Sequence, residues 1–313
     1  MTYDAETQRL LDLLADSGAP PLTELSPEEA RQAPGILMEL VGAGPGPDVA
    51  SVRDVEIPGS AGSISARIYD PVADPAGTVV YYHGGGWVFG SLDDFDAVCR
   101  TLAVASDARL VSVDYRLAPE HRFPAAADDA YAALQWVAGQ HPSGPIVVAG
   151  DSAGGNLAAV AALRARDEGG PQIELQLLVY PVVDCDLGRP SYVEYTDTTL
   201  LLNAAEMAWF WDHYVPDEAE RTHPYASPIR AASFEGLPPA YVVVAGHDPL
   251  RDEGLAYVAA LEAAGVPVTL RRYDDQIHAF FVFVGALESA DRAIADAGAA
   301  IRDAIAAQEP VAQ

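Results

Sequence analysis

The chain has 313 residues, half of them hydrophobic, and its 46 acidic residues against 18 arginines and no lysine give a formal net charge of −28. That charge argues against a nucleic-acid-binding protein, because binding of phosphate backbones needs a basic surface. The missing lysines exclude a lysine Schiff-base mechanism. The sequence has no run of about 18 apolar residues, so we expect no membrane span. The spacing of Cys99 and Cys185 predicts neither a disulfide nor a metal site.

Residues 1–6 are acidic and lack the charged-then-apolar pattern of a signal peptide, so we expect a cytoplasmic protein.

The first predicted elements are helices. Residues 4–15 carry leucines at helical spacing. A second helix is predicted to begin after Ser26, with Pro27 at its first position and Glu29 completing a capping box.

Strands come next and then alternate with helices. The predicted strands are 51–57, 63–69, 78–82, 110–113, 146–149, 173–180, 240–245 and 268–273. The predicted helices among and after them are 125–139, 155–166, 253–264 and 286–307. This order predicts an α/β protein with a mostly parallel sheet that helices cover on both faces.

The segment 181–239 interrupts the alternation, because it has little strand signal. Its one clear helix, 203–214, begins at Asn203 with Glu206 in a capping-box position, and its apolar residues form one stripe. Such a stripe packs on the sheet domain or forms a lid over a site, and both readings are compatible. No linker divides the chain into independently folding domains.

Residues 150–154 read Gly-Asp-Ser-Ala-Gly and carry the strongest functional signal. They follow a buried strand and lead into a helix. A serine between glycines at a strand-to-helix turn is typical of the nucleophile elbow of a serine hydrolase. The sequence therefore predicts Ser152 as a nucleophile, with the N–H of Ala153 directed at the place where an oxyanion forms.

An activated serine needs a histidine base and an orienting carboxylate, which in this architecture follow it in the order acid, then histidine. Asp248 lies on the loop after strand 240–245, and His278, the only histidine after Asp248, lies on the loop after strand 268–273. Parallel strands bring such loops to one edge of the sheet. The prediction is a triad of this pair with the serine; Asp252, Asp274 and Asp275 are the rival acids.

Residues 83–87, His-Gly-Gly-Gly-Trp, follow the strand 78–82. Glycines allow consecutive N–H groups to turn into a site and bind a developing oxyanion. A phosphate-binding loop is the rival reading, but the flanking residues of a Gly-Lys-Ser/Thr or Gly-x-Gly-x-x-Gly motif are missing. Upstream of an elbow, this run predicts the oxyanion loop of an ester hydrolase.

Together these motifs resemble the bacterial hormone-sensitive-lipase-like carboxylesterases of the α/β-hydrolase superfamily. The matching stretches are 83–87, 114–120 (Asp-Tyr-Arg-Leu-Ala-Pro-Glu), 150–155, 248–254 (Asp-Pro-Leu-Arg-Asp-Glu-Gly) and the loop of His278. They stand in family order from about residue 51 to the end of the chain, and no catalytic position departs from the family pattern.

The resemblance implies an α/β-hydrolase fold with an eight-stranded sheet. Residues 51–180 and 240–313 would form the catalytic domain, and residues 1–50 and 181–239 a helical cap. It also implies oxyanion donors at the backbone N–H groups of Gly85, Gly86 and Ala153. The implied activity is hydrolysis of short- to medium-chain acyl esters, which are small-molecule substrates, by a homodimer that needs no metal or cofactor.

Other functions use similar residues. The same triad hydrolyses amides, lactones or carbamates, and a true lipase acts at an oil interface. The plant gibberellin receptors resemble this family but bind a small molecule and lack the catalytic histidine, whereas His278 is present here. The residues predicted to line the substrate pocket, each equally explained by core packing, are Trp87, Phe89, Leu202, Trp209, Phe210 and Phe281.

Overall fold

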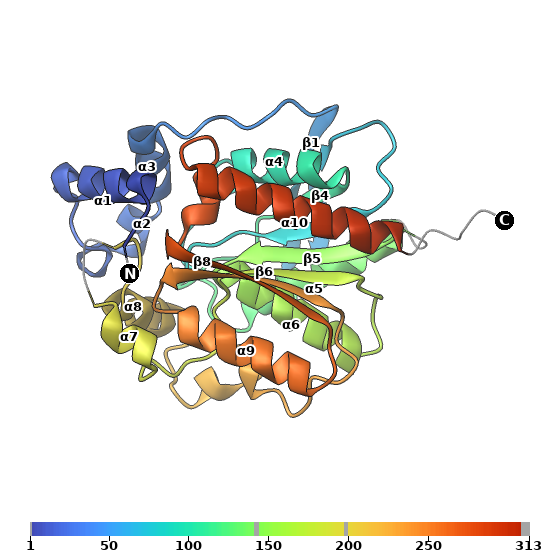
Figure 1. The fold of residues 1–313 in the computed structure, drawn as a ribbon. Helices are drawn as coiled ribbons and strands as arrows, with labels where there is room; N and C mark the ends of the chain where they lie inside the picture. The colour runs from blue at the N-terminus through green and yellow to red at the C-terminus, as the bar shows by residue number, and fades with distance from the viewer. Residues whose placement is uncertain (1, 141–143, 197–199, 308–313) are drawn as a thin grey trace.

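Eight strands form one sheet at the centre of the molecule (Figure 1). The computed structural model describes residues 2–140, 144–196 and 200–307. The strand order is β1-β2-β4-β3-β5-β6-β7-β8; β2 is antiparallel to β1 and to β4, and the other neighbours are parallel. The bounds are β1 Ser51–Gly59, β2 Gly62–Asp70, β3 Thr78–Tyr82, β4 Arg109–Val113, β5 Ile146–Asp151, β6 Leu175–Val179, β7 Ala240–His247 and β8 Val268–Ile277.

The middle of the sheet is its most buried part. Strands β3, β5 and β6 are buried along their whole length, and their sequences are nearly continuous apolar runs. A strand covered on both faces requires such a run, because neither set of alternating side chains meets water. The edge strand β1, in contrast, is mostly exposed. The turn that follows β5 therefore starts from the rigid centre of the sheet.

Helices cover both faces of the sheet (Figure 1). On one face lie α4 (Asp96–Ser106) and α10 (Glu288–Ala306), which pack against each other and share an apolar core with the sheet. On the other face lie α5 (Ala125–Gln140), α6 (Ala153–Asp167) and α9 (Arg251–Ala263), which enclose a second core. The predicted mostly parallel, doubly covered sheet is confirmed.

The remaining helices gather at one end of the sheet (Figure 1). They come from two distant parts of the chain: α1 (Ala5–Ser17), α2 (Pro27–Ala30) and α3 (Ala33–Val41), then α7 (Pro190–Glu194) and α8 (Ala204–Tyr214). The short 3₁₀ helix η1 (Leu22–Glu24) contacts α8 and joins the two groups. Three further 3₁₀ helices are η2 (Glu220–Thr222), η3 (Pro228–Arg230) and η4 (Phe280–Val282).

Several elements differ from the sequence-based expectation. Helices α3, α4 and α7 were not predicted, and β8 runs on to Ile277 where the sequence predicted an end at residue 273. The capping boxes at Ser26 and Asn203 are present as predicted. The buried side of α8 includes Met207, Phe210 and the two aromatics that follow at helical spacing, so the packing reading of its stripe holds. The assignment of residues 1–50 and 181–239 to a cap stays a prediction.

Candidate active site

Ser152 occupies the sharp turn between β5 and α6. Its backbone is in an unusual conformation, φ 54° and ψ −118°, which hydrogen bonds on either side maintain. Its N–H donates to the carbonyl of Val179 at 2.8 Å, and its own carbonyl accepts from the N–H of Asn156 at 3.0 Å. A Cβ on Gly154 would overlap the carbonyl oxygen of Tyr82, so the helix can begin this close to β3 only with glycine there.

A chain of hydrogen bonds links three of the predicted residues. The Nε2 of His278 lies 3.0 Å from the Oγ of Ser152, and its Nδ1 lies 2.7 Å from Oδ2 of Asp248. The N–H of Leu250 donates to the other oxygen of Asp248 at 2.8 Å. Because an ionised carboxylate only accepts hydrogen bonds, the proton of the neutral imidazole sits on Nδ1 and the lone pair of Nε2 faces the serine.

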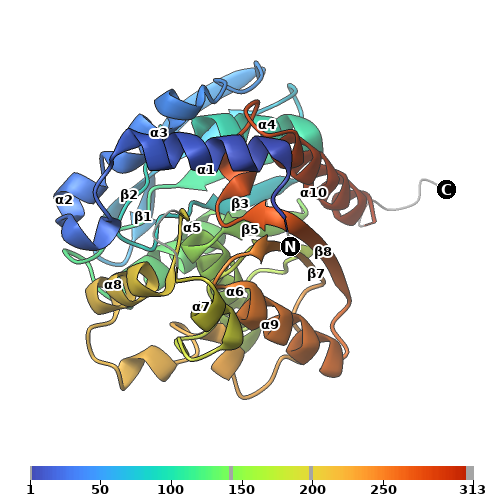
Figure 2. The same ribbon diagram turned by 60° about the vertical axis from the view of Figure 1, so that its left-hand side comes forward.

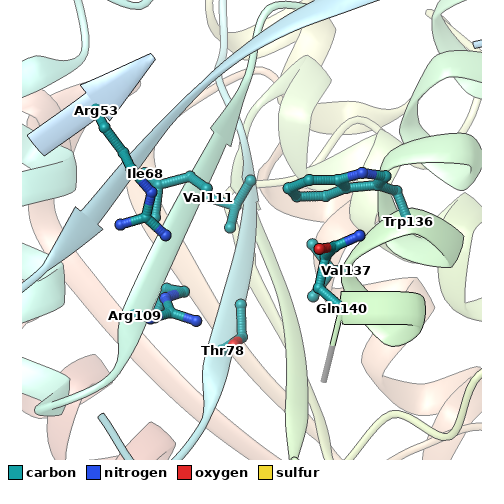
Figure 3. A pocket seen from close by; sticks show the side chains of 8 residues that line it. All are labelled: Arg53, Ile68, Thr78, Arg109, Val111, Trp136, Val137 and Gln140. Carbon is teal, nitrogen blue, oxygen red and sulfur yellow. The ribbon is translucent and has the colours of Figure 1, made fainter. Parts of the chain in front are cut away.

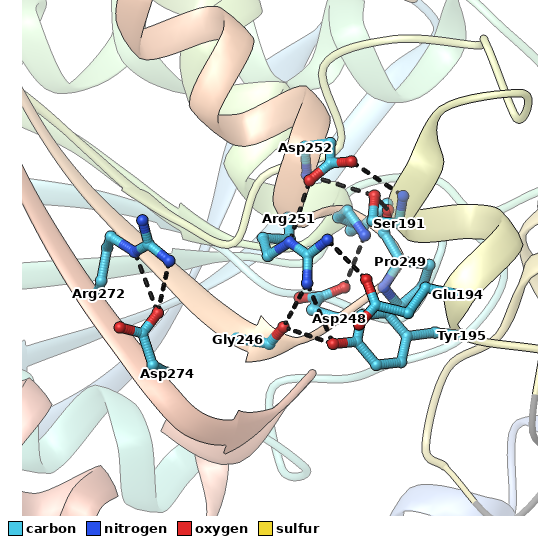
Figure 4. A network of polar contacts seen from close by, with 11 residues as sticks. Ser191, Glu194, Tyr195, Gly246, Asp248, Pro249, Arg251, Asp252, Arg272 and Asp274 are labelled. Atoms are coloured by element: carbon cyan, nitrogen blue, oxygen red, sulfur yellow. Dashed lines mark hydrogen bonds and ion pairs between the residues drawn. The ribbon is translucent and has the colours of Figure 1, made fainter. Parts of the chain in front are cut away.

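The rival acids make other contacts (Figure 4). Asp252 accepts bonds from the N–H of Ser191 at 2.9 Å and from Nε of Arg251 at 3.0 Å. Asp274 pairs with Arg272 at 2.7 Å on β8. Asp275 accepts a bond from Nε2 of Gln276 at 3.2 Å. In the described residues, no hydrogen bond joins these three carboxylates to the imidazole of His278, whereas Asp248 is bonded to it.

Arg251 anchors the loop of Asp248 to the segment around α7 (Figure 4). Its guanidinium donates to the carbonyl of Gly246 at 3.2 Å, to the hydroxyl of Tyr195 at 3.1 Å and to Glu194 at 2.8 Å. The Tyr195 hydroxyl also donates to the Gly246 carbonyl at 3.0 Å. The segment that follows β6 therefore holds the backbone just before Asp248.

The glycine loop after β3 lies beside the elbow. Gly85 and Gly86 have φ values of 104° and 58°, a region that favours glycine. The N–H of Gly84 donates to Oδ1 of Asp151 at 3.0 Å, which fixes the loop against the elbow. Among the described residues, no hydrogen bond occupies the N–H groups of Gly85, Gly86 or Ala153.

Two buried residues that the sequence did not single out support this loop. Asp151 accepts a bond from the Tyr81 hydroxyl at 2.7 Å in addition to that from Gly84, and burial raises its pKa to about 6. Burial lowers the pKa of His83 to about 4, so its ring is neutral; its Nδ1 donates to the Gly84 carbonyl at 2.7 Å, and the ring stacks on Tyr115. Both belong to quoted motifs, but spacing alone does not reveal a contact across 67 residues.

Comparisons with known proteins agree with this geometry. Residues 79–282, which include all three hydrogen-bonded residues, match the model of a family described by its alpha/beta hydrolase fold. The chain belongs to the α/β-hydrolase family. The predicted relation to bacterial hormone-sensitive-lipase-like carboxylesterases and the predicted fold class are thus confirmed.

Individual relatives of this α/β hydrolase are esterases. It is 47% identical over 254 residues to the esterase LipI of Mycobacterium tuberculosis, which covers 77% of this chain and 78% of the relative. It is 35% identical to an ethyl acetate hydrolase of Pseudomonas putida, over 88% of this chain and 89% of the relative. A solved thermostable esterase from Pseudomonas putida ECU1011 superposes with a TM-score of 0.91 at 37% identity, covering 97% and 98% of the two chains.

Of the predicted pocket residues, Phe89 and Phe210 flank the glycine loop of the hydrolase. Their ring centroids are 5.6 Å apart, and a Cβ on Gly86 would overlap the ring of Phe210. Trp209 contacts Phe210 edge-on at 5.3 Å and is half-buried. Phe89 and Phe210 are therefore the predicted pocket residues that lie against Gly85 and Gly86, and Trp209 packs behind Phe210.

The other three predicted pocket residues are buried in the cores. Trp87 is fully buried and stacks on Tyr214 at 4.3 Å. Phe281 is also fully buried and belongs to the core that α4 and α10 share with the sheet. Leu202 is 4% exposed and packs in the opposite core. Contact of these three with a substrate stays a prediction.

A separate cavity lies at the opposite edge of the sheet (Figure 3). It is lined by Thr78 and Arg109, the first residues of β3 and β4, whereas Ser152 follows the last residue of β5. Asp70 is ion-paired with both arginines of its wall, Arg53 and Arg109, at 2.6 Å each. This cavity is thus remote from the triad, and the two arginines of its wall share one ion-pair partner.

No helix in the described ranges has the length and apolar character needed to cross a membrane. Within those same ranges, no group of three or more His, Cys, Asp or Glu side chains is placed to hold a metal ion.

Proposed function

We propose that this α/β hydrolase is a serine carboxylesterase that cleaves short- to medium-chain acyl esters. The observation that carries the proposal is the continuous hydrogen-bonded chain from Ser152 through His278 to Asp248, beside a loop with free N–H groups. The names of its relatives, an esterase and an ethyl acetate hydrolase among them, support the same class of reaction.

The reaction proceeds in two acyl-transfer steps. His278 takes the proton of Ser152 as the serine oxygen attacks the ester carbonyl, and the new oxyanion accepts hydrogen bonds from the N–H groups of Gly85, Gly86 and Ala153. The imidazolium then gives its proton to the leaving alkoxide, the C–O bond breaks, and the acyl group stays on the serine. A water molecule, deprotonated by the same imidazole, attacks the carbonyl of the acyl-enzyme. The bond from the acyl carbon to the serine oxygen then breaks, the imidazolium returns its proton to that oxygen, and the acid leaves.

Asp248 supports both steps without taking part in proton transfer. It holds the imidazole in the tautomer that presents Nε2 to the serine, and its charge stabilises the imidazolium. Its burial and its second hydrogen bond from Leu250 fix the direction of the carboxylate. The set of residues needs no metal or cofactor for this chemistry.

Substitution of the serine tests the proposal. Ser152→Ala is expected to leave the melting temperature within a few degrees of wild type and to lower kcat for p-nitrophenyl butyrate by about 10⁴-fold or more. Ser112, which is buried on β4 outside the site, provides the control, because Ser112→Ala removes a hydroxyl of the same kind. Near-wild-type turnover by folded Ser152→Ala would reject the nucleophile, and equal losses in both variants would reject a specific role.

A homodimer and a cytoplasmic location belong to the same proposal, and the family resemblance supports the dimer. Size-exclusion chromatography with light scattering tests the oligomeric state. A mass near 33 kDa at micromolar concentration, which is that of one chain, would contradict the dimer.

A further inference from the structure

A buried glutamine lies two residues before the proposed base. Gln276 is fully buried near the end of β8, and its amide uses all four of its hydrogen-bonding positions. Its Oε1 accepts from the hydroxyls of Thr7 and Ser289, each at 2.9 Å. Its Nε2 donates to Asp4 at 2.7 Å and to Asp275 at 3.2 Å. One amide thus joins the N-terminal end of α1, the start of α10 and the last residues of β8.

The α1 side of this network is held in place. Asp4 is the N-cap of α1 and accepts the N–H of Thr7 at 2.7 Å. Burial opposes the ionisation of Asp4, but the hydrogen bonds from Thr7 and Gln276 outweigh it and lower its pKa, so the carboxylate is charged. Figure 2 shows α1 running beside the segment that joins β8 to α10.

The segment that carries His278 needs such support. Pairing between β7 and β8 becomes irregular between Ala245 and His247, just where β8 approaches its end. The residue after the base, Ala279, has a φ of 66°, an unfavourable conformation for alanine that persists only where the surroundings impose it. The strand ladder alone therefore leaves the direction of the imidazole underdetermined.

We propose that Gln276 is a positioning residue that couples α1 to the loop of His278 and thereby sets the imidazole between Ser152 and Asp248. The amide acts through the backbone of two residues and touches no reacting atom. Displacement of a catalytic group by about 1 Å is enough to cost a large factor in rate. The kinetic part of this inference rests on the proposed function, whereas the placement of the imidazole does not.

The isosteric variant Gln276→Glu tests the network. It removes both N–H donors and sets a second carboxylate against Asp4. We expect kcat for p-nitrophenyl butyrate to fall at least about tenfold while KM stays within about twofold. We also expect the downfield proton resonance of the hydrogen bond between His278 and Asp248 to broaden or disappear. A merely structural role of Gln276 would move neither the kcat-to-KM split nor this resonance in folded protein.

A second substitution is expected to rescue the first. In the double variant Gln276→Glu with Asp4→Asn, the amide at position 4 donates to the carboxylate at position 276, so the hydrogen bond is restored with reversed polarity. Asn serves as an N-cap as well as Asp does. We expect kcat to return to within about threefold of the wild-type value. We also expect the downfield resonance to regain its full intensity. Failure of the rescue would show that this hydrogen bond does not place the base.

Glu6 offers a matched control, since it accepts the N–H of Glu288 at 2.8 Å and ties α1 to α10 without contacting the amide. Glu6→Ala is expected to keep wild-type kcat; a loss equal to that of Gln276→Glu would overturn the proposal in favour of general docking of α1.

Wild-type kcat and wild-type resonance in folded Gln276→Glu would also overturn the proposal. If that variant does not fold, Thr7→Val removes the hydroxyl that donates to Gln276 and keeps the backbone N–H that Asp4 accepts. Unchanged kcat and resonance in Thr7→Val would overturn the proposal. A wild-type protein without esterase activity refutes the proposed function, while the resonance still decides the positioning.

Discussion

At the scale of single residues, the proposed nucleophile is strained but held by hydrogen bonds on both sides. The positive φ of Ser152 costs of order 1–3 kcal/mol for a residue other than glycine. It persists because the turn is bonded on both sides and because Gly154 lets α6 approach β3. Asp248 has both oxygens hydrogen-bonded. The reactive oxygen therefore has one place relative to the imidazole, which is the condition for efficient general-base catalysis.

The ring of Phe210 is the side chain most directly placed to limit the acyl chain, because it covers Gly86. Phe210→Ala is expected to raise the rate of p-nitrophenyl octanoate relative to acetate about tenfold and to cost about 3 kcal/mol of stability. A chain-length series of p-nitrophenyl esters measures the first effect. Phe123→Ala, which loses edge-on packing against Tyr214, should leave the chain preference unchanged; the same shift in both variants would show that Phe210 sets no limit.

At the scale of elements, loops that follow parallel strands are tied to elements far away in sequence. The buried carboxyl of Glu253, on the first turn of α9, accepts the N–H of Val183 at 2.7 Å and the Tyr192 hydroxyl at 3.0 Å. Burial raises the pKa of Glu253 to about 8. The loop after β6 and helix α7 are thus fixed to α9 by a carboxyl group that is neutral at pH 7.

This raised pKa makes stability depend on pH. The folded protein binds the proton of Glu253 more tightly than the unfolded chain, whose pKa is near 4.5. The stabilisation that the protonated Glu253 carboxyl gives to the folded protein is complete below pH 4.5 and is lost as the pH rises toward 8. Glu253→Gln, which mimics the neutral form, should therefore lose less melting temperature than wild type between about pH 6 and about pH 9. Glu262→Gln, exposed on the same helix, is the control; parallel curves for wild type and Glu253→Gln would refute the linkage.

The elements that the sequence predicts best are those marked by a short local pattern, either an unbroken apolar run or a capping box. The fully covered strands β3 and β5 are apolar runs, and the capping boxes at Ser26 and Asn203 are local. Helix α3 was missed because it contains Pro and Gly, and α4 because its N-cap residue, Phe95, has no side chain that can cap a helix.

The candidate triad was predictable, whereas its supports were not. Parallel strands bring their carboxyl ends to one edge, so the order of serine, Asp248 and His278 along the chain was informative. The contact of Asp151 with Gly84 spans 67 residues and that of Gln276 with Thr7 spans 269. No local pattern marks such contacts, because they depend on how whole elements dock.

At the scale of the whole molecule, each proposed catalytic group is held from a different part of the fold. The serine depends on the buried centre of the sheet, Asp248 on the segment around α7 through Arg251, and His278 on α1 through Gln276. The helices at one end of the sheet thus contact two of the three catalytic loops as well as covering that end (Figure 1). Because the net charge of −28 repels polyanions, we expect neutral esters to be hydrolysed faster than polyanionic ones.

Identification of the residue that a fluorophosphonate modifies tests the central claim most directly. The proposed mechanism predicts one covalent adduct per chain, which peptide mass spectrometry locates on Ser152. Hydrolysis of p-nitrophenyl butyrate is expected to fall in proportion as the adduct forms, and adduct formation is expected to be strongly slowed in His278→Ala. An active, folded protein that carries no adduct on Ser152, or that is inactivated through another residue, would contradict it.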